Sequence, residues 1–152
     1  MTGLLIIAHA PLASAWLAAA RHAFPEAVAD LRVLDVLPEQ SVEAVVDSAR
    51  AELQALSGSG HEEALLLCDV FGATPCNAAR VLAEEAGLRL LVGLNLPMLW
   101  RALNYRARPA DELVLLAAAG GTQGVMQLGV SRPQNQTLRP ARHDSNDGRH
   151  QQ

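Results

Sequence analysis

The chain has 152 residues, half of them hydrophobic, and a formal net charge of −4. This length fits one compact domain with a sizeable core. Every cation is an arginine, because the sequence contains no lysine. The acidic balance gives no basic surface of the kind that binds DNA or RNA, so a nucleic-acid partner is not expected.

The two cysteines, Cys68 and Cys76, match neither a disulfide framework nor the spacing of a zinc site. We interpret them as free thiols in a reducing cytoplasm. The N-terminus shows no targeting signal, and no apolar run is long enough to span a membrane. We therefore expect a cytoplasmic protein without direct membrane insertion, and the sequence suggests neither a metal nor a cofactor.

Short apolar runs alternate with longer segments of helical period, a pattern typical of βαβ units with a parallel sheet. Strands are predicted at 3–8, 31–37, 64–68 and 88–94. Helices are predicted at 12–23, 41–56, 75–86, 97–106 and 110–119, the last ending at Gly120-Gly121. The predicted fold is a single doubly wound α/β domain, with helices on both faces of a mainly parallel four-stranded sheet.

Capping residues and prolines mark several of these helix starts. Pro11 opens the first helix, Ser41 caps the second, and Thr74 with Pro75 begins the third, where Thr74 is the predicted N-cap. Asn95 is the predicted cap of the fourth helix. These residues place helix starts directly after the first and third strands.

The end of the chain divides into two parts. Residues 125–130 are predicted to add a short final strand. From Ser131 onward the chain is polar and has almost nothing to bury, so we interpret it as a disordered tail. The domain therefore covers 1–130 and the tail 131–152, where His143 and His150 carry little weight as metal or catalytic candidates.

Two predicted strands end in residues suited to phosphoryl chemistry. His9 follows the first strand and Asp69 the third, and ligands of an open parallel sheet collect at the carboxyl ends of its strands. A neutral imidazole attacks phosphorus through one nitrogen, while a carboxylate bonded to its other N–H fixes the tautomer. We predict His9 as the nucleophile and Asp69 as its partner. The alternatives are a structural histidine and an ordinary loop or capping carboxylate.

The helix starts beside these residues are predicted to bind the phosphoryl group, because their backbone N–H groups and dipole favour anions. The first start lies just beyond His9 and includes Ala10. The second is formed by Gly72, Ala73 and Thr74. Gly72 permits close approach of an oxyanion, and the Thr74 hydroxyl is a donor. A plain N-cap role accounts equally for the position of Thr74.

Three sequence blocks share a wider pattern: residues 4–9 (LLIIAH), 68–79 (CDVFGATPCNAA) and 92–99 (VGLNLPML). In order and spacing they resemble the mannose-family enzyme IIA domain of the sugar phosphotransferase system, and the similarity spans about residues 2–130. The resemblance implies that His9 is the phosphorylated residue and Asp69 its hydrogen-bonded partner. It also implies that Thr74 supplies a hydroxyl that contacts the phosphate.

The resemblance also implies partners. Family members accept the phosphoryl group from the phosphocarrier protein HPr and pass it to a IIB domain. They are typically homodimers in which a C-terminal strand crosses to the neighbour's sheet, and residues 125–130 are the candidate for that strand. The sequence departs from the best-known sugar-transport members at Ala8, Ala10-Pro11 and Ala73-Thr74. These departures bear more on the identity of the partner protein than on whether His9 is phosphorylated.

Three functions remain open at this point. The first is phosphoryl relay toward a sugar permease, with His9 as the covalent carrier. The second is a regulatory protein whose phosphorylation state is read by binding partners. The third is the phosphoryl-donor subunit of a dihydroxyacetone kinase, which resembles the same family. The sequence contains no IIB domain, so we expect the phosphoryl acceptor to be a separate protein.

Overall fold

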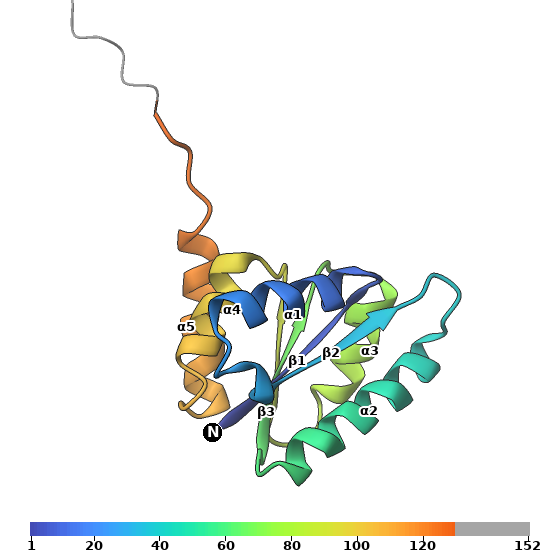
Figure 1. Ribbon diagram of the computed structural model, residues 1–152. Helices are drawn as coiled ribbons and strands as arrows, with labels where there is room; N and C mark the ends of the chain where they lie inside the picture. Colours follow the sequence, from blue (N-terminus) through green and yellow to red (C-terminus); the bar gives the residue numbers. More distant parts are fainter. Residues whose placement is uncertain (130–152) are drawn as a thin grey trace, which may run out of the picture.

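Four parallel strands form the centre of the computed structural model, which describes residues 1–129. They are β1 (Thr2–His9), β2 (Leu31–Val36), β3 (Glu63–Cys68) and β4 (Leu88–Val92). Their order in the sheet is β2-β1-β3-β4, and all neighbours pair in parallel (Figure 1). The winding direction reverses between β1 and β3, so the carboxyl ends of these two strands form the topological switch point.

Within the described residues, five α-helices cover the sheet: α1 (Leu12–Ala23), α2 (Val42–Gly58), α3 (Thr74–Leu82), α4 (Leu96–Asn104) and α5 (Ala110–Gln123). A 3-10 turn, Val28–Asp30, precedes β2. Helices α1, α4 and α5 pack on one face, and α2 and α3 pack on the other (Figure 1). The predicted doubly wound α/β class is confirmed. None of these helices has the length and apolar character that a membrane crossing requires.

Strand β1 is buried on both of its faces. Leu4 and Ile6 point into the core under α1, α4 and α5, while Leu5 and Ile7 belong to the core under α2 and α3. A strand covered on both sides needs a continuous apolar run rather than an alternating one. Each of these fully buried side chains stabilises the fold by about 1.5–3 kcal/mol.

Side-chain caps start two of the helices, as predicted. Ser41 Oγ accepts a hydrogen bond from the backbone N–H of Ala44 at 3.2 Å, at the start of α2. Asn95 Oδ1 accepts from the N–H of Met98 at 2.9 Å, at the start of α4. The Asn95 amide also donates to the carbonyl of Gly121 at 3.1 Å, which joins the start of α4 to α5.

Helix α3 differs from the prediction at both ends. Its N-cap is Ala73, without a side-chain cap, so the prediction that Thr74 is the N-cap is wrong. It ends at Leu82 rather than near Ala86. The chain must turn there to enter β4, and Gly87, with φ of 79°, lies in the left-handed region just before the strand.

Helix α5 does not stop at Gly120-Gly121 but continues to Gln123. Both glycines are buried where α5 crosses α4. A Cβ on Gly120 would lie 2.8 Å from Arg101 Cβ, and one on Gly121 would lie 2.8 Å from Met98 Cε. The predicted helix stop is therefore wrong, because these glycines permit close helix packing.

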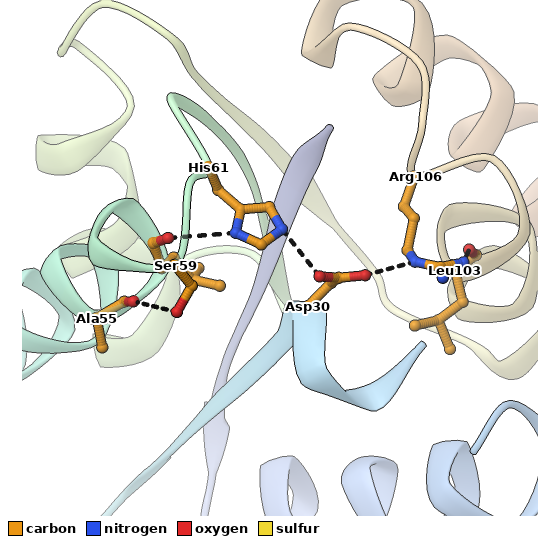
Figure 2. Close-up of polar contacts among 7 residues, drawn as sticks. Asp30, Ala55, Ser59, His61, Leu103 and Arg106 are labelled. Atoms are coloured by element: carbon orange, nitrogen blue, oxygen red, sulfur yellow. Dashed lines mark hydrogen bonds and ion pairs between the residues drawn. The ribbon is translucent and has the colours of Figure 1, made fainter. Parts of the chain in front are cut away.

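At the amino ends of the strands, a polar group of residues that we call the Asp30 cluster joins the two helical layers (Figure 2). The Asp30 carboxylate accepts from Arg106 Nε at 2.6 Å and lies 3.0 Å from His61 Nε2. His61 Nδ1 lies 3.2 Å from the carbonyl of Leu56, and Arg106 Nη1 donates to the carbonyl of Leu103 at 3.0 Å. The cluster connects the segments that precede β2 and β3 with the end of α4.

The segment after α5 leaves the body of the protein (Figure 1). Residues 125–129 form no strand, because none of the strands within residues 1–129 pairs with them. Three large apolar side chains of this segment are exposed: Val125 at 78%, Met126 at 68% and Leu128 at 81%. Val130, and the predicted tail at 131–152 with His143 and His150, lie outside the described residues.

Candidate functional site

His9 and Asp69 meet at the switch point of the sheet. His9 is the last residue of β1, and Asp69 directly follows β3. The two strands are neighbours, with Ile7 opposite Cys68, so side chains 60 residues apart in the sequence lie together. The apolar runs bury each strand up to this edge, and the first polar residue emerges where the strand ends. The side chain of His9 is 46% exposed and that of Asp69 is 12% exposed.

Asp69 holds His9 in place through two contacts. Its Oδ2 accepts from the backbone N–H of His9 at 3.0 Å and lies 2.7 Å from ring Nδ1. Its Oδ1 accepts from the backbone N–H of Val70 at 2.8 Å. Partial burial by itself raises the pKa of Asp69, but the hydrogen bonds from His9 and Val70 outweigh burial and lower this pKa from its ordinary value.

An ionised Asp69 defines the tautomer of a neutral His9. A carboxylate only accepts hydrogen bonds, so the proton of the ring lies on Nδ1. The lone pair then lies on Nε2, in a ring that is nearly half exposed. The arrangement supplies an accessible nucleophilic nitrogen with a supporting carboxylate behind it.

The loop after Asp69 leads directly to the start of α3. Gly72 has φ of 83°, in the left-handed region, and no atom lies within 4 Å of the position that a Cβ would take. The backbone conformation rather than crowding therefore favours glycine here. Ala73 offers no side-chain cap to α3, so the first N–H groups of this helix and the hydroxyl of Thr74 are available to an anion.

Ala10 does not have the free donor that the sequence suggests. Its backbone N–H already donates to the carbonyl of Val36 at 3.0 Å. The prediction that Ala10 binds phosphate through this N–H therefore does not fit the structure. Of the four residues predicted to bind phosphate, Gly72, Ala73 and Thr74 remain as candidates.

Sequence reasoning missed a second carboxylate at this edge of the sheet. Asp35, in β2 opposite Ala8, accepts hydrogen bonds from the backbone N–H of Ser14 at 3.1 Å and from the Ser14 hydroxyl. The available signal was a polar residue one position before the end of a strand. Its partner in α1 could not be read from the sequence.

Cys68 lies in β3, just before Asp69, and is fully buried. Burial raises its pKa well above the usual range, and the nearby Cys76 and Asp69 add to the rise. The protonated thiol lies 3.8 Å from the carbonyl of Pro75. Cys68 is therefore a packing residue rather than a reactive one. Within residues 1–129, no three His, Cys, Asp or Glu side chains are grouped closely enough to hold a metal ion.

A family model, EIIA-man, described as the PTS system fructose IIA component, matches residues 3–117. The chain belongs to the EIIA-man family. The matched region contains His9, Asp69 and the loop that leads to α3. As a IIA protein of the phosphotransferase system, the chain is a phosphotransferase component.

Known proteins similar to this IIA protein come from several bacteria. The PTS system mannose-specific EIIAB component of Escherichia coli (strain K12) is 33% identical over 98 residues, which cover 62% of this chain and 30% of that protein. The chain thus matches less than a third of this longer relative. The mannose/sorbose specific IIA subunit from Enterococcus faecalis superposes with a TM-score of 0.74 at 26% identity, covering 86% of this chain and 97% of the other.

A third similar protein supports the fold alone. The component EIIA from Streptococcus agalactiae has a TM-score of 0.73 at 23% identity, covering 84% of this chain and 97% of the other. The arrangement of strands and helices in this IIA protein is therefore shared with solved IIA structures.

Proposed function

We propose that this IIA protein accepts a phosphoryl group from phospho-HPr on Nε2 of His9 and passes it to a IIB partner. The observation that carries the proposal is the contact of 2.7 Å between His9 Nδ1 and Asp69. An ionised carboxylate at that nitrogen leaves the lone pair of Nε2 free to attack phosphorus.

The transfer requires little chemistry from the protein beyond this pair. The lone pair of Nε2 forms a bond to phosphorus as the bond between phosphorus and the donor breaks, and the donor takes back that electron pair. The ring of His9 gains positive charge, which the Asp69 carboxylate stabilises through the Nδ1–H. Transfer to the IIB partner repeats the same exchange with the acceptor as the nucleophile.

Residues at the start of α3 are proposed to bind the oxygens of the phosphoryl group. The first turn of α3 contains no acidic side chain and no side-chain cap, so its positive end is not compensated there. The backbone at Gly72 and Ala73 and the hydroxyl of Thr74 supply donors that do not themselves react.

An apolar rim at the carboxyl ends of the strands supports a protein as the phosphoryl donor. The segment after each strand carries at least one exposed large apolar side chain: Leu12, Leu37, Val70, Phe71 and Leu96. Phe71, next to Gly72, is 73% exposed. Exposed apolar groups gathered at one edge are typical of protein–protein contact surfaces.

Mass spectrometry of the intact chain tests the proposal. After incubation with phosphoenolpyruvate, enzyme I and HPr, the wild type is expected to gain one acid-labile phosphate, and His9→Ala to gain none. His22→Ala, which removes an exposed histidine of α1, is the matched control and keeps the gain. A phosphate that persists in His9→Ala would overturn the assignment.

Addition of IIB proteins to the phosphorylated chain tests the second half of the relay. We expect the phosphate to leave His9 and to appear on a IIB protein. Retention of the phosphate on this chain in the presence of every IIB protein of the host would contradict relay and favour a regulatory role.

The chain is further proposed to assemble as a homodimer through residues 125–130. The exposed side chains of Val125, Met126 and Leu128 need apolar partners to be removed from water. Strand β4 is an edge of the sheet among the described residues, and an edge strand pairs readily with a segment of another chain.

A further inference from the structure

A carboxylate from β2 holds the first turn of α1. Asp35 Oδ1 accepts from the backbone N–H of Ser14 at 3.1 Å, and Oδ2 accepts from the Ser14 hydroxyl. Helix α1 has no cap of its own, because Pro11 at the N-cap offers no side-chain acceptor and the first turn contains no acidic residue. Asp35 therefore takes the role of a capping residue from a different element.

Strand β2 also fixes the link between His9 and α1. His9 lies opposite Val36 in the β1–β2 pairing, and the carbonyl of Val36 accepts from the N–H of Ala10 at 3.0 Å. The backbone between His9 and α1 is thus hydrogen-bonded to β2 at two places. Ala10, before Pro11, bonds to the carbonyl of Val36, and Ser14, after Pro11, bonds to the carboxylate of Asp35. We expect the loss of either attachment to change the position of the backbone that follows His9.

The two helix starts at the site differ in charge. The positive end of α1 is compensated by Asp35. Helix α3 has neither a side-chain cap nor an acidic residue in its first turn. The start of α3 therefore offers an anion an uncompensated positive helix end, whereas the start of α1 does not.

We propose that Asp35 is a positioning residue for phosphoryl transfer, an inference that rests on the proposed function. It acts through Ser14: by holding the first turn of α1, it keeps the His9 ring in the orientation that Asp69 supports. By compensating the positive end of α1, it directs the phosphoryl group to α3. Asp69 contacts the nucleophile directly, whereas Asp35 sets the position of the backbone next to it.

Initial rates of phosphoryl uptake, measured at varied phospho-HPr concentration on the full chain, test this role. Asp35→Ala is expected to lower kcat by roughly 10-fold, because the nucleophile is less well positioned. KM is expected to stay the same or fall, because a negative charge near the phosphoryl group is lost. A purely structural role predicts no such separation of kcat from KM.

Two further variants separate the hydrogen bonds from the charge. Asp35→Asn keeps an oxygen that accepts from the Ser14 N–H but loses the charge, so kcat is expected to stay within about 3-fold of the wild type while KM falls. Ser14→Ala loses only the hydroxyl contact, and its kcat is expected to lie between those of the wild type and Asp35→Ala. Asp47→Asn, an exposed carboxylate of α2, is the control and changes neither constant.

Each outcome decides the question. An unchanged kcat in Asp35→Ala with a wild-type circular dichroism spectrum overturns the inference and leaves the proposed function standing. A raised KM overturns it as well, whatever the value of kcat. If Asp35→Ala does not fold, Ser14→Ala decides: a lowered kcat supports the inference and an unchanged kcat overturns it. If the wild type itself takes up no phosphate, the proposed function fails and the inference fails with it.

Discussion

The carboxylate oxygen Oδ2 of Asp69 contacts His9 twice, at its backbone N–H at 3.0 Å and at ring Nδ1 at 2.7 Å. The backbone contact sets where the histidine lies, and the ring contact sets which nitrogen carries the proton. A single oxygen atom therefore controls both the position and the tautomer of the proposed nucleophile. Mutations at the two residues should have different effects for that reason.

Asp69→Asn is expected to slow phosphoryl uptake by roughly 10²–10⁴-fold without abolishing it. The amide has no charge to stabilise the ring as it becomes positive, but Nε2 remains present. His9→Ala should lose uptake completely, because it removes the acceptor atom. Rates of phosphate gain from phospho-HPr measure both effects, and an equal and complete loss in the two variants, with the fold intact, would contradict this division of roles.

The depressed pKa of Asp69 predicts a loss of stability in acid. A carboxylate whose folded-state pKa is lowered stabilises the fold at pH values above its unfolded value of about 3.9, and this contribution is lost as the pH falls through the folded-state value. The wild type should therefore lose more free energy of unfolding than Asp69→Asn on acidification below about pH 4.5. Urea denaturation of both proteins across this pH range measures the two free energies of unfolding. The same pH dependence in both proteins would contradict a stabilising contribution from ionised Asp69.

The Asp30 cluster predicts a large effect on stability and none on chemistry. In Asp30→Ala the guanidinium of Arg106, 21% exposed, and the buried ring of His61 both lose their carboxylate. We expect the free energy of unfolding to fall by about 3 kcal/mol. Arg108→Ala, which breaks an exposed pair with Glu112, is the control and should cost less than about 1 kcal/mol.

These two stability variants are compared by chemical denaturation, and their phosphoryl uptake is compared under conditions where both are folded. The Asp30 cluster lies at the amino ends of the strands, opposite the site. Folded Asp30→Ala should therefore take up phosphate at the wild-type rate. If Asp30→Ala lowered the free energy of unfolding by no more than Arg108→Ala does, the Asp30 cluster would stabilise the fold no more than an exposed ion pair.

The close packing of α4 and α5 leads us to expect that Gly120→Ala destabilises the protein. The added methyl group would lie 2.8 Å from Arg101 Cβ and 3.1 Å from the backbone carbonyl oxygen of Pro97, and overpacking of this kind costs about 1–3 kcal/mol. Gly58→Ala, at the end of α2, meets no atom within 4 Å and should be neutral or stabilising by up to about 1 kcal/mol. Thermal denaturation of the two variants measures the difference, and equal midpoints would rule out the packing role of Gly120.

If residues 125–130 hold the proposed dimer together, truncation before and after this segment should give different oligomeric states. A chain cut after Gly124 lacks the exposed apolar residues and is expected to be monomeric by light scattering. A chain cut after Ser131 keeps them and is expected to remain a dimer. A monomer at high micromolar concentration in the longer chain would count against the proposed strand exchange.

Much of the sheet could be predicted because burial leaves a clear pattern. The apolar runs of β1 and β3 are continuous, and both strands are covered on two sides. Helix ends were less predictable, since Gly120-Gly121 is typical of a helix stop. Whether α5 continues there depends on α4, which packs against the two glycines. A local pattern does not contain that long-range contact.

The site was predictable to the same extent. His9 and Asp69 stand out because each is the polar residue at which a buried apolar run ends, His9 as the last residue of β1 and Asp69 directly after β3. Asp35 gave a weaker signal, as a polar residue one position before the end of a strand, and its pairing with Ser14, 21 residues away, gave none. The Asp30 cluster was also missed, since its members are brought together only by the folded sheet.

The pairing of β1 with β3 has a consequence for how reactivity arises during folding. A chain in which these strands are still apart already contains the imidazole, but the ring exchanges freely between its two tautomers and has no carboxylate behind it. The imidazole of His9 obtains its supporting carboxylate only when β1 pairs with β3. The time course with which a refolding chain becomes reactive toward a phosphoryl donor is therefore a direct readout of when its central ladder forms.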